Sequence, residues 1–152
     1  MKRFALLATC SLLLSGTAAL ADGKVYVTLP DMAVFAKDPV VADRMLRNLY
    51  NATVLSVNCP GASLSDAEHS LLTDSFDLLA YGELKLSTDE LISRYEGPAF
   101  AQLDDPDACI EEADLKEQML NDLRDAGGST VPLADQEQAY HDWRALMDAI
   151  RP

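Results

Sequence analysis

Cysteine is the residue type with the most definite chemistry in this sequence, which has three cysteines. Cys10 lies in an apolar N-terminal segment, and the rest of the chain keeps one pair, Cys59 and Cys109. In an oxidising compartment an even number of cysteines favours a disulfide bond. The alternatives are a metal-binding pair or a catalytic thiol, but the sequence has no Cys-x-x-Cys and neither histidine lies near either cysteine. We therefore favour a structural disulfide between Cys59 and Cys109.

The two histidines, His69 and His141, are the candidates for general acid-base chemistry or metal binding, because imidazole titrates near neutral pH. Each has an acidic neighbour, Glu68 before the first and Asp142 after the second. Neighbouring residues on a helix do not face one another, so neither pair is a catalytic dyad by spacing. We expect both histidines on solvated helix surfaces. An enzyme of the hydrolase class, with a site assembled in space around His69 or His141, is the alternative.

Recognisable catalytic and cofactor motifs are missing from the sequence. There is no Gly-x-Ser-x-Gly elbow, and no pair of histidines has the helical i, i+4 spacing of zinc sites. Gly127-Gly128 follows a predicted helix, whereas a phosphate-binding glycine loop precedes one. We therefore assign no catalytic residue and expect no cofactor and no metal.

Acidic residues are concentrated in one segment, at Asp104, Asp105, Asp107, Glu111, Glu112, Asp114 and Glu117. The segment does not fit a calcium loop, because Ile110 stands where the sixth position requires glycine. A weak, unspecific cation site is a minor alternative. Acids in the first turn of a helix oppose its positive end, and those beyond it favour a solvated face. Glu111, Glu112 and Asp114 are our candidates for a partner-binding acidic face.

The overall charge supports that interpretation. Twelve basic residues stand against 25 acidic ones, which gives a formal net charge of −13. Such a surface should repel nucleic acid and anionic membranes and favour a basic patch on a protein partner. The sequence thus predicts a basic protein partner and no nucleic-acid binding.

The N-terminal segment has the three parts of a secretory signal peptide. Lys2 and Arg3 are followed by an apolar run over residues 4–14 and by small residues that end at Ala21. The apolar run is too short to cross a bilayer, which needs about 20 residues. A lipoprotein site with Cys10 as the acylated residue is a less favoured alternative. We expect residues 1–21 to be removed, which gives a mature charge of −13 − 2 = −15, a periplasmic or secreted location, and no membrane segment after cleavage.

The first half of the remaining chain has helical periodicity. Asp38-Pro39 predicts a helix start, and Cys59-Pro60-Gly61 predicts its end near residue 58. Ser65 and Glu68 match a capping box, which predicts a second helix that weakens at Tyr81-Gly82. Residues 22–38 are predicted to form an extended arm and a short turn. Alternating residues at 24–29 and 83–87 leave open a small two-stranded ribbon.

The second half continues this pattern. Ser87 and Glu90 form a second capping box, and Gly97-Pro98 predicts the end of that helix. A fourth helix is predicted to begin at Asp105-Pro106, with Cys109 in its first turn, and to end at Gly127-Gly128. The last helix should close the core with one apolar face, formed by Ala139, Tyr140, Trp143, Leu146, Met147 and Ile150.

These elements predict an all-α fold, a small disulfide-stapled bundle of about four to five helices with a short extended N-terminal arm, in which residues 39–152 form a single domain. The order of signal peptide, helix ending at Asn58-Cys59, capped helix, Ser-Thr-Asp-Glu-Leu-Ile-Ser-Arg-Tyr and second cysteine resembles small uncharacterised two-cysteine periplasmic helical families of proteobacteria. The resemblance covers about residues 40–125. It implies a helical domain with a Cys59–Cys109 bridge and no particular activity. We therefore expect an exported, non-catalytic protein that binds another protein or an envelope component.

Overall fold

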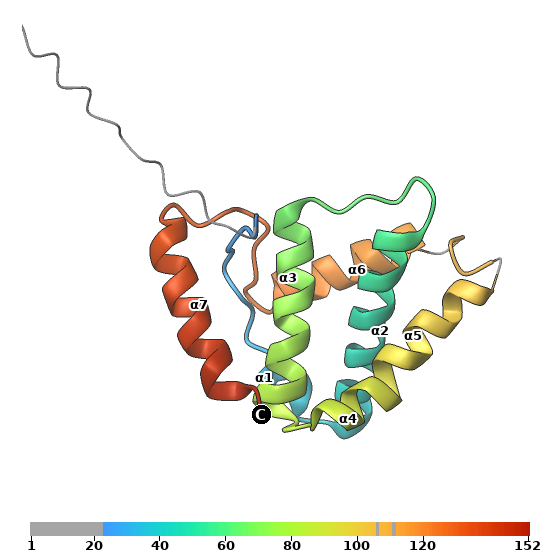
Figure 1. Cartoon of the computed structure of the whole chain (residues 1–152), viewed down its shortest axis with the longest axis horizontal. Helices are drawn as coiled ribbons and strands as arrows, with labels where there is room; N and C mark the ends of the chain where they lie inside the picture. Colours follow the sequence, from blue (N-terminus) through green and yellow to red (C-terminus); the bar gives the residue numbers. More distant parts are fainter. Residues whose placement is uncertain (1–22, 106, 111) are drawn as a thin grey trace, which may run out of the picture.

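A computed structural model describes residues 23–105, 107–110 and 112–152, so the predicted signal peptide lies outside the described residues. Within them the structure is built from helices, and the only β-pairing is an isolated bridge. The predicted all-α fold is thus confirmed (Figure 1). None of the described helices is both long enough and apolar enough to span a bilayer.

The short helix α1 (Ala33–Ala36) leads into α2 (Pro39–Asn58), which has the bounds predicted from the sequence. The Asp38 carboxylate accepts a hydrogen bond from the Val40 N–H at 2.8 Å, and proline follows where no N–H is needed. Cys59 ends α2 in an extended conformation. This long helix lies at the centre of the bundle.

The second predicted helix is α3 (Asp66–Asp77), and it continues directly into the π-helix η1 (Leu78–Glu83). Its capping box is present as predicted: the Ser65 hydroxyl accepts from the Glu68 N–H at 3.3 Å, and the Glu68 carboxylate accepts from the Ser65 N–H at 2.9 Å. The π-helix has a wider turn than an α-helix, and such turns are often found at functional sites.

The third helical segment continues past Gly97-Pro98, where the sequence predicts a stop. It comprises α4 (Thr88–Leu91), the π-helix η2 (Ile92–Glu96), α5 (Gly97–Ala101) and the short 3₁₀ helix η3 (Gln102–Asp104). Pro98 has no N–H to donate to the carbonyl of Arg94, four residues earlier. The Arg47 side chain of α2 donates to that carbonyl at 3.4 Å instead. The predicted stop is wrong because a tertiary contact satisfies the group that proline leaves free.

Helix α6 (Glu112–Asp125) begins later than the predicted start at Asp105-Pro106. The Asp105 carboxylate accepts from the Asp107 N–H at 2.9 Å, so this aspartate caps a tight turn rather than the helix. Cys109 lies in a turn before α6 and not in its first helical turn. Pro106 lies outside the described residues.

The predicted end of α6 is confirmed. Gly127 has φ +96°, a left-handed conformation that glycine adopts without strain, and the Gly128 N–H donates to the Leu123 carbonyl at 2.9 Å. A Cβ atom at Gly128 would lie 2.9 Å from that same carbonyl oxygen. The left-handed conformation at Gly127 and the close approach at Gly128 together explain why two glycines follow this helix.

The N-terminal arm lies between α3 and α7 (Gln136–Ile150), as Figure 1 shows. Val27 forms the isolated bridge with Pro132, so the arm pairs with the loop before α7, and the described residues show no ribbon between 24–29 and 83–87. Lys24 forms an ion pair of 2.6 Å with the buried Asp74 of α3. Burial raises the pKa of Asp74 above its usual value, and the contact with Lys24 offsets only part of this effect.

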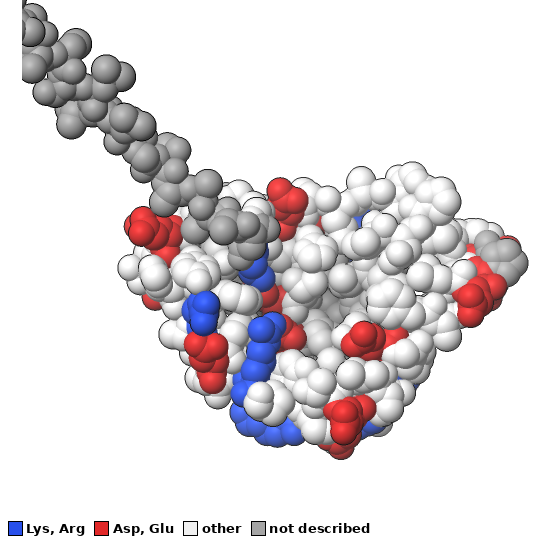
Figure 2. Space-filling model, viewed as in Figure 1, with Lys and Arg blue, Asp and Glu red and all other residues white. Residues whose placement is uncertain are grey.

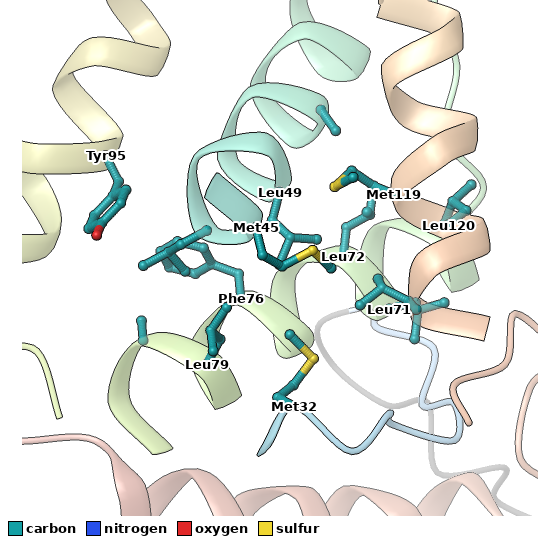
Figure 3. Packing of buried hydrophobic residues seen from close by; sticks show 14 of the residues in the cluster. Met32, Met45, Leu49, Leu71, Leu72, Phe76, Leu79, Tyr95, Met119 and Leu120 are labelled. Carbon is teal, nitrogen blue, oxygen red and sulfur yellow. The ribbon is translucent and has the colours of Figure 1, made fainter. Parts of the chain in front are cut away.

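The core lies where α2, α3 and α6 meet, with contributions from η1 and from the loop before α1 (Figure 3). The side chains labelled in Figure 3 converge from these elements and, for Tyr95, from η2: Met32, Met45, Leu49, Leu71, Leu72, Phe76, Leu79, Tyr95, Met119 and Leu120. The predicted role of the last helix needs correction. Within α7 only Ala139 and Met147 are buried, and Trp143 packs on Tyr26 of the arm with ring centroids 5.7 Å apart.

Candidate binding pocket

A pocket of about 500 Å³ lies on the face made by α2, α3, η1, α4 and η2. Figure 2 shows charged side chains around a mostly uncharged depression on this face. The lining combines aromatic, aliphatic, hydroxyl and charged groups: Tyr50, Thr53, Thr73, Phe76, Asp77, Tyr81, Thr88, Leu91, Ile92, Glu96, Arg151 and Pro152. Binding pockets for small ligands have volumes of roughly 300–1,000 Å³, so this one is large enough for one or two side chains.

Aromatic rings form one wall of the pocket. Tyr50 of α2 and Phe76 of α3 meet edge to face, with their centroids 4.0 Å apart. Tyr81 belongs to the π-helix η1 that extends α3, and it is almost fully buried. Aromatic faces attract cations as well as apolar groups. This wall therefore suits a ligand that has an apolar part and a positive charge.

The opposite wall comes from the segment α4–η2. Ile92 is 46% exposed and gives the pocket an open apolar rim, while Leu91 is buried behind it. The second capping box orders the start of this segment, because the Glu90 carboxylate accepts from the Ser87 N–H at 2.9 Å. A local capping signal in the sequence thus sets the start of the helical segment that contains Ile92.

Glu96 is the acidic residue of this wall. Its carboxylate accepts a hydrogen bond from the Tyr50 hydroxyl at 3.3 Å, and no ion pair joins it to a basic side chain of the described residues. Burial raises the pKa of the Tyr50 phenol, and the charge and hydrogen bond of Glu96 raise it further. Tyr50 therefore keeps its proton at neutral pH and stays a donor to Glu96.

Asp77, at the end of α3, is the second acidic residue of the pocket. Arg151, which directly follows α7, donates a hydrogen bond from its guanidinium to the Asp77 carboxylate. The Asp77 side chain is 14% exposed and that of Arg151 is 45% exposed. The negative charge of Asp77 also contributes to the raised pKa of Tyr50, so both acids act on one hydroxyl group.

The disulfide predicted from the sequence is present. Cys59, at the end of α2, is bonded to Cys109, and their Cα atoms are 5.5 Å apart. The two alternatives, a metal-binding pair and a catalytic thiol, both require unbonded cysteines, so neither fits two cysteines that are bonded to each other. The bridge joins the loop before α3 to the turn before α6 and lies away from the lining of the pocket.

The predicted acidic face on Glu111, Glu112 and Asp114 does not form as expected. Glu112 is only 5% exposed, because it faces α2, where the Ser56 hydroxyl donates to its carboxylate. Glu111 lies outside the described residues, and Asp114 is exposed. Glu112 is therefore a structural residue and not a surface charge.

Asp114 lines a second, more polar depression together with Asp105 and Asp107. Exposed acidic side chains such as these also serve simply to keep a protein surface hydrated. Among the described residues, no group of three or more histidine, cysteine or acidic side chains is arranged to hold a metal ion. We assign no ligand to this depression.

The two histidines are exposed, as the sequence predicts. His69, on α3, lines a shallow depression with Lys24 and Asp66, and His141, on α7, lies 5.2 Å from the ring of its neighbour Tyr140. Within the described part of the chain, neither imidazole has a hydrogen bond or ion pair with a carboxylate. Among the residues that the structure describes, neither histidine is therefore paired with an acid.

The pocket was not found by sequence reasoning. Helical spacing places Tyr50 and Phe76 on apolar helix faces, and no motif of the sequence includes Asp77, Glu96 or Arg151. One feature of the sequence points towards the pocket: the acidic residue Glu96 stands directly before the helix end predicted at Gly97. It does not indicate which side chains of other helices lie opposite Glu96.

Comparisons with protein-family models, with curated proteins and with solved structures found no match to this chain. The resemblance to two-cysteine periplasmic families therefore stays a prediction.

Proposed function

We propose that this chain is an exported, non-catalytic binding protein, and that its pocket takes up a basic side chain of another protein. The observation that carries the proposal is Glu96, an acidic group inside a partly apolar pocket that has no basic partner in the described structure. Glu96 is half-buried, and a basic ligand would supply the counter-charge that this carboxylate lacks.

The other lining groups support the same ligand. The rings of Tyr50 and Phe76 would pack against the aliphatic part of a lysine or arginine side chain, since such side chains have apolar stems and charged heads. Ile92 at the rim would contact an apolar neighbour in the same partner segment. An apolar, basic segment is therefore the kind of partner that this surface fits.

The net charge of the chain adds to the attraction. With a formal charge of −15 after removal of Lys2 and Arg3 (−13 − 2), the exported protein would attract a basic partner and so raise the association rate. At physiological salt, the attraction between exposed charges that lie more than about 8 Å apart is largely screened by ions. Binding should therefore weaken as salt is raised, while the apolar contacts in the pocket persist.

The test is calorimetric titration with a capped pentapeptide in which one basic residue stands between leucines. We expect binding by the wild-type protein and a loss of about tenfold or more in affinity for Glu96→Gln, because a close charge pair contributes more than about 1.4 kcal/mol. Glu83→Gln is the matched control, since Glu83 is exposed at the end of η1 and does not line the pocket.

Two results would contradict the proposal. If Glu83→Gln weakens binding as much as Glu96→Gln does, the attraction is that of the overall charge and not of the pocket. If the peptide with a neutral residue in the basic position binds equally well, the pocket is merely apolar. Either result removes Glu96 as the recognition group.

Export is the second part of the proposal, and it rests on the layout of residues 1–21 and on the disulfide, which is typical of oxidising compartments. The intact mass of protein isolated from the periplasm or medium should correspond to a chain that begins at Asp22. A species that retains Cys10 with an attached lipid would contradict this cleavage and support a lipoprotein.

A further inference from the structure

Arg151 already places a positive charge in the acidic pocket from within the chain itself. We propose that Arg151 occupies the binding position of an arginine, and that the arginine of a partner displaces it from Asp77. This inference rests on the proposed function and names both the ligand group and the competition that regulates access to it.

The contact between Arg151 and Asp77 is suited to exchange. The Asp77 side chain is held at the junction of α3 and η1 and is mostly buried, whereas nearly half of the Arg151 side chain is exposed. Because the partner's arginine takes the place of Arg151, the mostly buried Asp77 carboxylate keeps a cation throughout the exchange, and only the half-exposed Arg151 has to move. The acid is the fixed half of the pair and the arginine is the replaceable half.

The anchoring of Arg151 is also limited. It follows directly after α7, a helix that lies to one side of the bundle and has only two buried residues (Figure 1). The Arg151 N–H donates to the Met147 carbonyl at 3.0 Å, which ends the helix, and the side chain contacts Asp77 and the ring of Trp143. Release of the side chain therefore need not disturb the core.

The chemistry of the pocket favours a guanidinium over an ammonium group. The planar guanidinium donates several hydrogen bonds at once and stacks on aromatic faces, while an ammonium is a compact and strongly hydrated charge. The pocket offers both kinds of partner: the carboxylates of Asp77 and Glu96, and the rings of Tyr50 and Tyr81. The intramolecular pair shows that a guanidinium reaches this acid.

Trp143 provides a direct readout of the displacement. It is the only tryptophan of the chain, and the Arg151 guanidinium carbon lies 5.8 Å from its ring centroid. Loss of a nearby positive charge changes the emission of an indole ring. Its fluorescence therefore reports whether Arg151 has left, independently of the affinity.

The experiment titrates wild type, Arg151→Gln and Arg144→Gln with three versions of the capped pentapeptide, which carry arginine, lysine or the neutral isostere citrulline. Arg144 is an exposed arginine of the same helix that does not line the pocket, so its variant matches the change in charge. Arg151→Gln should bind the arginine peptide about two- to fivefold more tightly than wild type, as expected for removal of a weak competing ion pair. Arg144→Gln should bind like wild type.

The fluorescence should follow the same logic. The arginine peptide should change the Trp143 emission of wild type and of Arg144→Gln, and Arg151→Gln should show no further change on binding. The lysine peptide should bind more weakly, and the citrulline peptide should not bind.

Different results separate the two proposals. If the arginine peptide binds wild type and Arg151→Gln equally and leaves the Trp143 emission unchanged, the displacement is wrong and the pocket remains the binding site. If the lysine peptide binds as tightly as the arginine peptide, the guanidinium assignment is wrong. If no basic peptide binds to any of the proteins, the proposed function fails and this inference fails with it.

Discussion

Glu112 and Asp114 show how two acids in one helical turn can have different roles. Glu112 faces α2 and accepts a hydrogen bond from Ser56, whereas Asp114 faces solvent. Their types and spacing alone suggest one continuous acidic face. What separates them is the direction in which α6 presents each side chain, and this depends on where α6 begins and on what it packs against.

At this scale we predict that Glu112→Ala destabilises the protein and Asp114→Ala does not. Removal of the Glu112 carboxylate leaves the buried Ser56 hydroxyl without its acceptor, which costs about 1–3 kcal/mol. The exposed Asp114 should change the free energy of unfolding by less than about 0.5 kcal/mol. Urea denaturation at pH 7 measures both values, and equal effects would contradict the structural role of Glu112.

The helices themselves were predictable wherever a local signal decides them. Two capping boxes and the Asp38-Pro39 start require only residues within one turn, and each is found where the sequence places it. The end predicted at Gly97-Pro98 failed because Arg47, distant in sequence, satisfies the carbonyl that proline leaves free. A signal read from neighbouring residues cannot include a donor from another helix.

At the scale of elements we predict that the first capping box makes the stability of the protein sensitive to acid. Burial by itself would raise the pKa of Glu68, but the N–H and hydroxyl of Ser65, together with the charges of Lys116 and Arg124, outweigh it and hold the pKa below its usual 4.5. A carboxyl group with a lowered folded-state pKa adds stability above pH 4.5, and this stability is lost as the pH falls through the folded value.

Ser65→Ala should therefore have two measurable effects. It should lower the free energy of unfolding by about 1 kcal/mol at pH 7, as for other lost helix caps. It should also make the loss of stability between pH 5 and pH 3 smaller, because the Glu68 carboxylate loses the hydroxyl hydrogen bond and keeps only the backbone N–H bond and the nearby charges of Lys116 and Arg124. Thermal denaturation across this range tests the prediction. Ser63→Ala, at an exposed position outside the box, serves as the control, and equal acid sensitivity of both variants would count against it.

For the molecule as a whole, the fold class and the bridge were predictable, and the pocket was not. The fold follows from periodicity, caps and the pairing of two cysteines, all of which are properties of single segments. The pocket needs Tyr50, Asp77, Glu96 and Arg151 to meet from α2, α3, η2 and the end of α7. Helix packing brings these four residues together, and their spacing in the sequence does not predict it.

We predict that replacement of Cys59 and Cys109 by serine lowers the free energy of unfolding by about 2–5 kcal/mol and preserves the helix content. The bridge limits the freedom of the unfolded chain, whereas the helices depend on their own caps and on the core of α2, α3 and α6. Guanidinium denaturation followed by circular dichroism measures both quantities. A variant that loses its helical signal in water would show that the bridge is required for folding.

The position of the bridge has a mechanical consequence. Cys109 follows Cys59 by 50 residues, and the closed loop contains α3, η1, α4, η2, α5 and η3, while α1, α2, α6 and α7 lie outside it. A force applied to the two ends of the oxidised chain would be carried across the sulfur atoms and would never reach the enclosed helices. Reduction should release about 170 Å of additional contour length, at roughly 3.4 Å per residue. In a stretching experiment on the oxidised protein, only the chain outside the disulfide loop would extend. The segment between Cys59 and Cys109 would extend only after the disulfide is reduced.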